Sequence, residues 1–224
     1  MSIPTSPQIS PSVLSADFSI LTEQIQSVEN AGCEVLHLDV MDGHYVPNLT
    51  FGPLLVKAIR KITDRELEAH LMISDPDKYI ERFIKAGADV VLVHPETCES
   101  VDETLDRIKS LGAKAGLVVN PAEQLSIVKP YLDRIDQLLI MSVVPGFGGQ
   151  SFMPEVLAEL PELRPSLEAN QVLVEIDGGI NRSTISSVIN KGIHRFVAGS
   201  AVFNSKATPA ENYSELQALA TTDT

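Results

Sequence analysis

The stretch Ala31–His44 reads AGCEVLHLDVMDGH, and its pattern decides the fold. Gly32 follows an amphipathic segment of helical periodicity, and the largely apolar run Val35–Val40 begins shortly after it. Glycine commonly ends a helix in the left-handed conformation, and a nearly continuous apolar run is typical of a parallel strand that is covered on both faces. The stretch therefore predicts a passage from a helix into a parallel strand.

The same passage recurs along the chain, at AGA around Gly87, LGA around Gly112 and KGI around Gly192. Hydrophobic periodicity predicts eight strands, at Ile9–Leu14, Val35–Val40, Leu67–Ile73, Asp89–Val93, Lys114–Val119, Gln137–Ser142, Gln171–Asp177 and Arg195–Ala198. It predicts eight helices between and after them, at Phe18–Ala31, Pro53–Lys61, Pro76–Ala86, Val101–Leu111, Ala122–Val128, Pro154–Ala169, Arg182–Lys191 and Pro209–Ala220.

Eight consecutive strand-then-helix units predict an α/β protein with a single (β/α)8 TIM barrel domain over residues 1–224, of which residues 221–224 are expected to be a loose tail. The rival is an open, doubly wound sheet. That fold usually carries a G-x-G-x-x-G loop after its first strand, whereas PSVLSAD, Pro11–Asp17, follows the first strand here.

Composition narrows the class of protein. The 224 residues include 17 basic and 30 acidic side chains, for a formal charge of −13, and 44% are hydrophobic. No apolar run approaches the ~20 residues that a bilayer span needs, and the N-terminal segment lacks the pattern of a secretory signal. Cys33 and Cys98 are too few for a disulfide framework and are expected to be reduced packing residues. We expect a cytoplasmic protein that binds neither nucleic acid nor membranes.

Polar residues gather where the predicted strands end, which is where barrel enzymes carry their chemistry. Alternation places His37, Asp39 and Met41 on one face of their strand, and His70 with Met72 on one face of the next. Asp177 ends the seventh predicted strand. Two imidazoles and two carboxylates can bind one divalent transition metal, although a hydrogen-bonded network of ion pairs is the alternative.

Three methionines are expected on the same strand faces as these polar residues. Met41, Met72 and Met141 stand at strand ends. Methionine usually fills a core, and this interpretation is favoured here. The grouping of these three beside polar residues would also suit an apolar lining for a reactive intermediate.

Glycine-bearing loops follow the last three predicted strands. VVPGFGGQSF, Val143–Phe152, contains no Lys or Arg, so its backbone N–H groups would form a dipolar cradle. Asp177-Gly178-Gly179 and Ala198-Gly199-Ser200 follow the next two strands, which is the usual phosphate site of such barrels.

Other reactive patterns are absent from the strand ends. Lys and Arg are scarce there, which argues against a Schiff-base lysine, and no serine triad is evident. His44, His94 and His194 stand apart from the polar stripe and are expected to be hydrogen-bonded or exposed histidines that bind no metal.

The chain from Pro11 to about Phe203 resembles the ribulose-phosphate 3-epimerase family. The signature segments are HLDVMDGHYVPNLTFGP from His37, HLMISDP from His70, SVVPGFGGQSFM from Ser142, EIDGGI from Glu175 and AGSAVF from Ala198. The resemblance implies a ribulose-phosphate-binding barrel that interconverts D-ribulose 5-phosphate and D-xylulose 5-phosphate by inverting C3. It also implies a homo-oligomer.

The resemblance further implies roles for individual residues. His37, Asp39, His70 and Asp177 would bind one divalent ion, Zn, Fe, Mn or Co, and Asp39 and Asp177 would also be the acid/base pair. Ser12 and His70 would contact the substrate. The residues around the phosphate would be Gly146, Phe147, Gly148, Gly149, Gly178, Gly179, Gly199 and Ser200.

Two departures from the family pattern lie at Val144, where Asn or Glu is more usual, and in the AEQL segment of residues 122–125, where a threonine is common. We expect these to change affinity at most. Three alternatives stay open: an epimerase of a longer ketose such as D-allulose 6-phosphate, a decarboxylase or aldolase, and a sugar-phosphate-binding barrel without catalysis. A decarboxylase or aldolase site usually needs a lysine among its carboxylates, and none is found at His37-x-Asp39.

Overall fold

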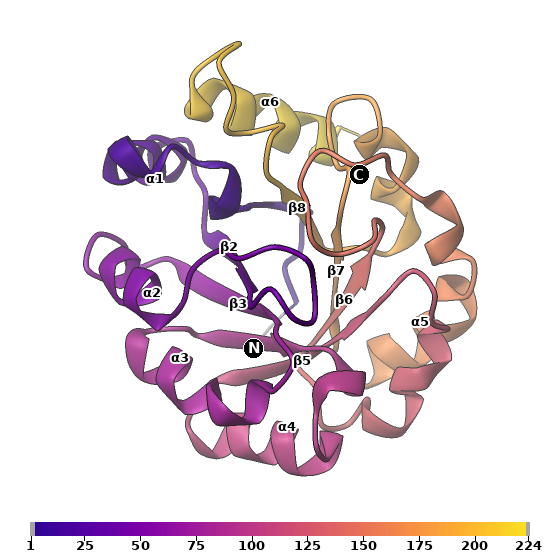
Figure 1. The fold of residues 1–224 in the computed structure, drawn as a ribbon. Coiled ribbons are helices and arrows are strands. Elements are labelled where there is room, and N and C mark those ends of the chain that lie inside the picture. Colours follow the sequence, from indigo (N-terminus) through magenta and orange to yellow (C-terminus); the bar gives the residue numbers. More distant parts are fainter. Residues whose placement is uncertain (1–2, 223–224) are drawn as a thin grey trace.

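Eight parallel strands form one sheet that closes on itself, as Figure 1 shows along the barrel axis. The computed structural model describes residues 3–222. The strands are β1 Gln8–Pro11, β2 Val35–Met41, β3 Glu66–Met72, β4 Val90–Val93, β5 Lys114–Val119, β6 Gln137–Met141, β7 Leu173–Asp177 and β8 Arg195–Ala198. Their order is β1-β8-β7-β6-β5-β4-β3-β2, and a parallel bridge between Ser12 and His37 joins β1 to β2. The predicted TIM barrel is confirmed.

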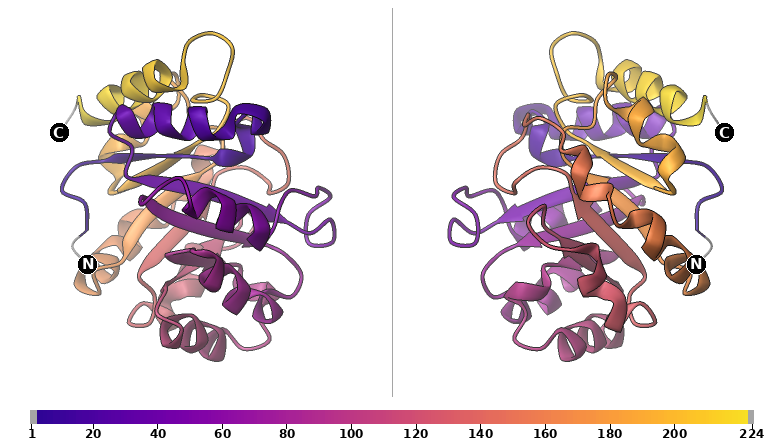
Figure 2. Two further views of the ribbon diagram at one scale, coloured as in Figure 1. Left: turned by 90° about the vertical axis from the view of Figure 1, so that its left-hand side faces the viewer. Right: turned by 90° about the vertical axis from the view of Figure 1, so that its right-hand side faces the viewer.

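Helices surround the barrel, and Figure 2 shows them outside the strands from two sides. They are α1 Leu21–Asn30, α2 Pro53–Arg60, α3 Ile80–Ala86, α4 Val101–Ser110, α5 Leu160–Ala169 and α6 Pro209–Thr221. Local chemistry fixes their ends: α6 begins with a capping box between Thr208 and Glu211, and α3 ends at Gly87 with φ +114°.

Two predicted helices are wrong. Residues 122–128 contribute to a 3-10 segment, Leu125–Tyr131, and Pro130 inside it has no N–H to donate. Residues 182–191 hold two short 3-10 turns, Ile185–Ser187 and Ile189–Lys191. Here side-chain hydroxyls compete for backbone carbonyls, since Thr184 donates to the Gly179 oxygen and Ser187 to the Thr184 oxygen.

Three further helices, α1, α3 and α5, begin later than predicted, because 3-10 turns stand at Phe18–Ile20, Pro76–Lys78 and Pro154–Leu157. The first predicted strand likewise ends at Pro11, before a 3-10 turn at Val13–Ser15. At the C-terminal end, Thr221 closes α6 instead of belonging to a tail, and residues 223–224 lie outside the described residues.

The barrel wall separates two apolar regions. Outward-facing residues such as Leu36, Leu38 and Ile176 belong to the large core between sheet and helices. A smaller cluster that includes Leu92, Leu139 and Met141 comprises inward-facing strand residues. Alternation therefore sends His37 and Asp39 into the barrel, between their outward-facing neighbours. Within residues 3–222, no helix has the length and hydropathy needed to cross a membrane.

Candidate active site

Four side chains meet inside the barrel near the C-terminal ends of three strands. His37 and Asp39 come from β2, His70 from β3 and Asp177 from β7, and one ligand-type atom of each lies within 4.8 Å of the others. His70 Nδ1 is 3.3 Å from Asp39 Oδ1, and His37 Nε2 is 3.4 Å from the same oxygen. Asp177 Oδ2 is 3.8 Å from both of these nitrogens. The structure thus brings together all four residues that the sequence pattern singled out as candidate ligands.

The hydrogen bond beneath His37 indicates what this cluster can hold. His37 Nδ1 is 3.3 Å from Glu68 Oε2, and both side chains are fully buried. Burial alone would raise the pKa of Glu68, but Arg195 and His37 outweigh it and lower the pKa to about 2. A carboxylate only accepts, so His37 carries a proton on Nδ1, and its Nε2 is the nitrogen that faces the cluster.

A nitrogen lone pair and two carboxylates aimed at one point repel each other unless a cation lies between them. In the metal-free chain a proton fills that role: burial lowers the pKa of His37, yet Asp39 and Glu68 outweigh burial and raise it well above 6.5. A divalent ion would displace this proton, because an imidazole nitrogen binds a metal through its lone pair. Two nitrogen and two oxygen donors fit a divalent transition metal.

The two aspartates differ in charge state although they share this cluster. Burial would raise the pKa of Asp39, but the charge and hydrogen bond of His37 outweigh it and hold the pKa well below its usual range. Ser12 Oγ also donates to Asp39 Oδ2 at 2.5 Å. Burial and the Asp39 charge raise the pKa of Asp177 to about 7, against the opposing effect of His37. Near neutral pH, one carboxyl group is ionised and the other holds a proton for much of the time.

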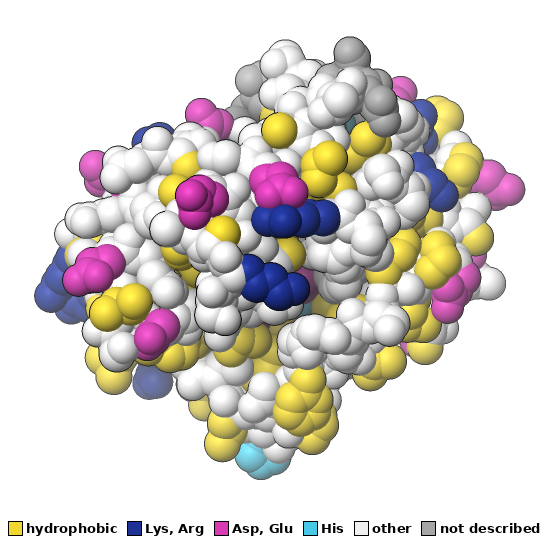
Figure 3. Space-filling model, turned by 90° about the horizontal axis from the view of Figure 1, so that it is seen from above, with side chains coloured by type: hydrophobic (Ala, Val, Ile, Leu, Met, Phe, Trp, Pro, Cys, Tyr) yellow, Lys and Arg dark blue, Asp and Glu magenta, His cyan; other side chains and the backbone are white. Residues whose placement is uncertain are grey.

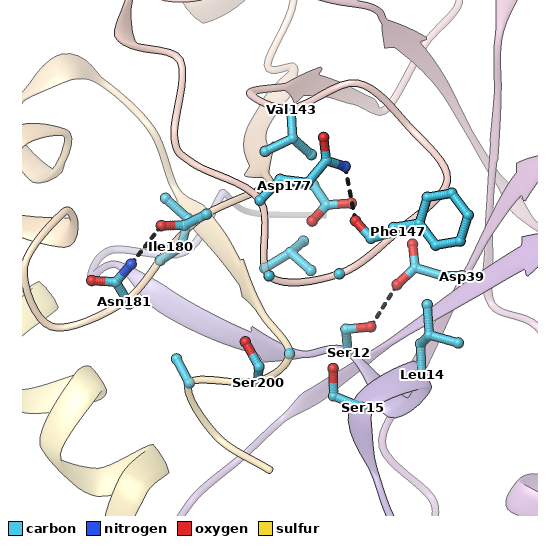
Figure 4. A pocket seen from close by; sticks show the side chains of 18 of the residues that line it. Ser12, Leu14, Ser15, Asp39, Val143, Phe147, Asp177, Ile180, Asn181 and Ser200 are labelled. Atoms are coloured by element: carbon cyan, nitrogen blue, oxygen red, sulfur yellow. Dashed lines mark hydrogen bonds between the residues drawn. The ribbon is translucent and has the colours of Figure 1, made fainter. Parts of the chain in front are cut away.

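A cavity of about 480 Å³ opens above the cluster, and Figure 4 shows Asp39 and Asp177 lining it together. Met41, Met72 and Met141 line it too, and each is at most 6% exposed. The other lining residues that the sequence analysis singled out are Ser12, Gly146, Phe147, Gly148, Gly149, Gly178, Gly179, Gly199 and Ser200. His70 is fully buried and does not line the cavity, and its contact with substrate stays a prediction.

Glycine is required where two of these loops approach other backbone or side chains. Gly179 has φ +67°, and a Cβ there would lie 2.7 Å from the Phe152 nitrogen. A Cβ on Gly199 would lie 2.5 Å from Ser15 Oγ. Side chains at these positions would strain or displace the loops that border the cavity.

A family model for the "Ribulose-phosphate 3 epimerase family" matches residues 8–203. The chain belongs to the ribulose-phosphate 3-epimerase family. It is 46% identical over 199 residues to a ribulose-phosphate 3-epimerase of Bacillus subtilis (strain 168), covering 88% of this chain and 92% of that protein. It is 49% identical over 202 residues to the chloroplastic ribulose-5-phosphate-3-epimerase of Arabidopsis thaliana, covering 88% of this chain and 72% of that protein.

Solved structures of lower identity share the barrel of this ribulose-phosphate 3-epimerase family member. KGPDC from Streptococcus mutans superposes with a TM-score of 0.72 at 16% identity, over 96% of this chain and 98% of its own. 3-Hexulose-6-phosphate synthase from Salmonella typhimurium gives a TM-score of 0.70 at 17% identity, over 95% and 98%. At such identities the likeness concerns the fold alone.

A buried polar network, which the sequence analysis did not predict, lies next to the cluster inside the barrel. Gln137 Nε2 donates to Glu68 Oε1 at 3.1 Å and to Glu175 Oε2 at 2.6 Å, while Arg195 Nη1 bonds Glu68 and lies 2.7 Å from Glu66. Burial and the nearby Glu68 charge raise the pKa of Glu175 well above its ordinary value. Strand alternation could have indicated this network. Glu68 and Glu175 stand two residues before His70 and Asp177, so they face the barrel interior as well.

Two basic residues at the cavity were also missed. Arg182 and Lys206 both line it, although the glycine loop itself has neither type. Arg182 Nη2 is 2.6 Å from Glu215 and donates to Asn212 Oδ1 at 3.2 Å. Basic and acidic side chains also stand next to one another in the middle of the face that Figure 3 shows from above. These cations come from loops beyond the strands, where strand periodicity gives no signal.

The remaining histidines divide into two groups. His44 Nδ1 lies 3.1 Å from the Asp42 oxygen in its own loop, and His194 Nδ1 accepts from the Val174 nitrogen, so neither approaches the cluster. His94 was expected to stand apart from the polar stripe, and that expectation is wrong. Its Nε2 is 3.0 Å from His70 Nε2, because His94 follows β4 in the inward-facing phase.

The cysteines and the departures from the family pattern lie away from the cluster. Cys33 and Cys98 are both free thiols, and burial raises their pKa values to about 12 and about 11. Val144 is 62% exposed and does not line the cavity. Its effect on affinity, like that of residues 122–125, stays a prediction.

Proposed function

We propose that this chain catalyses the epimerisation of D-ribulose 5-phosphate and D-xylulose 5-phosphate at C3. The observation that carries the proposal is the pair Asp39 and Asp177, which reach one cavity from β2 and β7 with pKa values shifted in opposite directions. Inverting a carbon beside a ketone requires removing a proton from one face and adding one to the other. Two carboxyl groups in opposite protonation states match that requirement.

The proton transfers follow from these charge states. Asp39, which starts ionised, takes the proton from C3, and Asp177, which starts protonated, delivers its own proton to the opposite face. The sugar passes through a cis-enediolate between the two transfers. The reverse reaction starts from the complementary state, with Asp177 as base and Asp39 as acid. Ser12 holds the Asp39 carboxylate in place through its hydrogen bond to Oδ2.

His37, Asp39, His70 and Asp177 would hold one divalent ion, with zinc, iron, manganese and cobalt all suited to the donor set. When bound, the ion supplies positive charge that stabilises the negative charge developing on the sugar oxygens. His37 contributes Nε2, since Glu68 fixes its proton on Nδ1.

The lining of the cavity supports the same reaction. Met41, Met72 and Met141 exclude water from the reacting carbon, which protects the enediolate from side reactions. Residues 146–149, 178–179 and 199–200 line the cavity, and their backbone N–H groups would bind the phosphate without a lysine in the loop. The net charge of −13 repels anions at long range, so such local dipoles would help to hold the phosphate.

Incubation of the enzyme with D-ribulose 5-phosphate in deuterated water tests the proposal. We expect D-xylulose 5-phosphate that carries deuterium at C3. Binding of the sugar without label at C3 would reject catalysis and leave a sugar-phosphate-binding barrel. Values of kcat/KM for D-ribulose 5-phosphate and D-allulose 6-phosphate, measured side by side, decide between the pentulose and the hexulose, and we expect the pentulose to be preferred.

Assembly and location are further parts of the proposal. We expect a homo-oligomer in the cytoplasm. Sedimentation of the purified chain measures the number of copies, and a monomer at micromolar concentration would reject the oligomer.

A further inference from the structure

A row of hydrogen-bonded side chains leads from the surface to the metal-binding cluster. Glu96 Oε1 accepts from the Tyr45 hydroxyl at 2.6 Å, and that hydroxyl lies 2.9 Å from His94 Nδ1. His94 Nε2 is in turn 3.0 Å from His70 Nε2. Glu96 is 43% exposed at the outer end, whereas His94 and His70 are fully buried. The row uses three residues that the proposed reaction does not employ.

Glu96, at the outer end of the row, determines which group donates in each of these hydrogen bonds. Burial would raise the pKa of Glu96, but the neighbouring His94, 3.7 Å away, and the hydrogen bond from Tyr45 outweigh it and lower the pKa to about 2. Glu96 is therefore a carboxylate that only accepts, and Tyr45 must donate its hydroxyl proton to it. Asn120 Nδ2 donates to the Tyr45 oxygen at 2.7 Å and to Glu96 at 2.6 Å. The Tyr45 oxygen is left as an acceptor toward His94.

The acceptor at Tyr45 in turn determines which nitrogen of each imidazole carries the proton. His94 must carry its proton on Nδ1 to donate to Tyr45, because a neutral ring has one N–H and a buried imidazolium would be costly. Its Nε2 is bare and accepts from His70, so His70 carries its proton on Nε2. The bare Nδ1 of His70 consequently faces Asp39 Oδ1, 3.3 Å away, and Asp177 Oδ2, 3.8 Å away.

We infer that Glu96, Tyr45 and His94 are positioning residues that hold His70 in the tautomer whose Nδ1 lone pair can bind a divalent ion. This inference rests on the metal site of the proposed function. The row performs for His70 the task that Glu68 performs for His37, since both fix a proton on the nitrogen that points away from the cluster. Without the row, His70 could place its proton on Nδ1 and donate it to Asp39, which would block the metal position.

The tautomer of His94 in the zinc-loaded protein tests the inference directly. A free imidazole of histidine favours the proton on Nε2, whereas the row requires it on Nδ1. Nitrogen–proton NMR correlations of the imidazole rings locate both protons. We expect His94 protonated on Nδ1 and His70 on Nε2. A His94 proton on Nε2 overturns the inference and leaves the metal site standing, whereas a wild-type chain that takes up no Zn²⁺ overturns both.

Zinc affinity provides the second test. Tyr45→Phe removes the central hydroxyl, and we expect Zn²⁺ binding about 10- to 100-fold weaker, which is the usual effect of losing an outer hydrogen-bond partner. Glu96→Gln should act in the same direction while it preserves the shape of the side chain. Tyr79→Phe is the matched control, because Tyr79 is 39% exposed and lies against Arg82 in a contact that needs no hydroxyl. Equal Zn²⁺ dissociation constants for Tyr45→Phe and Tyr79→Phe overturn the inference.

Discussion

At the residue scale, the cluster combines two carboxyl groups that would be equivalent in water. Asp39 lies 3.3–3.4 Å from two imidazole nitrogens and accepts from the Ser12 hydroxyl, whereas Asp177 is 3.8 Å from the same nitrogens and is repelled by the Asp39 charge. Environment alone therefore assigns the initial base and the initial acid. The same arrangement costs folding free energy in the metal-free chain, because Asp177 resists ionisation.

The unfavourable ionisation of Asp177 in the folded, metal-free chain predicts how the free energy of unfolding depends on pH. The pKa of Asp177 rises from an ordinary 3.8 to about 7, so its favourable contribution to the metal-free protein is complete below pH 4 and is lost as the pH rises through 7. Metal-free Asp177→Asn should gain stability over the wild type across this range, by up to roughly 4 kcal/mol. Urea denaturation at pH 4 to 8 measures the difference.

Asp39→Asn is the control of opposite sign. The pKa of Asp39 is lowered, so its ionised form stabilises the folded chain above pH 4, and the substitution should destabilise the metal-free protein at pH 7. Equal shifts for the two variants would contradict the assignment of different charge states.

The alternation of residues along the strands was enough to predict which side chains form the cluster. It was not enough to predict the hydrogen-bond partners that orient them. His37-x-Asp39 and His70 lie on inward faces by period two alone. His94 stands in the same phase two residues beyond Leu92, but its strand is otherwise apolar, so nothing local distinguished it from a loop histidine. The partner of His37, Glu68, is ionised by Arg195, which lies 127 residues away, and such pairing cannot be read from local spacing.

At the element scale, the strands are predicted more accurately than the helices. A strand buried on both faces has a continuous apolar run that few other structures share. The segments at residues 122–128 and 182–191 have helical periodicity, yet Pro130, Thr184 and Ser187 alter the backbone hydrogen bonds that a helix would use. In such loops local side-chain chemistry outweighs hydrophobic pattern.

The loop after β7 provides a prediction at this scale. Gly179→Ala places a Cβ 2.7 Å from the Phe152 nitrogen at a φ of +67°, so we expect the affinity for inorganic phosphate to fall about tenfold or more. Gly148→Ala is the matched control, since no atom lies within 4 Å of its added Cβ. Calorimetric titration with phosphate gives both dissociation constants. Similar constants for the two variants would show that the loop after β7 does not shape the anion site.

At the scale of the whole molecule, the barrel interior carries an ionic network beneath the cluster. Arg195 is 6% exposed and bonds Glu66 and Glu68, so removing it leaves buried carboxylates without a cation. Arg195→Met should destabilise the protein by about 3–5 kcal/mol. Arg182→Met removes an arginine that is 51% exposed and pairs with Glu215, and should cost about 0–1 kcal/mol. Chemical denaturation compares the two, and equal losses would contradict a structural role for the interior network.

The closed sheet explains why one site can use both faces of a substrate. β2 and β7 are far apart in the sheet order, and closure between β1 and β2 brings their C-terminal ends around one cavity. The repeated strand-then-helix pattern predicted this closure.

Hydrogen exchange at C3 in deuterated water, measured with zinc-loaded Asp39→Asn and Asp177→Asn, tests the central claim most directly. Each variant keeps one carboxyl group, so we predict that each exchanges the C3 hydrogen of one epimer only, that the two variants select different epimers, and that interconversion falls by orders of magnitude in both. Exchange of the same epimer by both variants, or interconversion near the wild-type rate in either one, would contradict an acid and a base on opposite faces of the sugar.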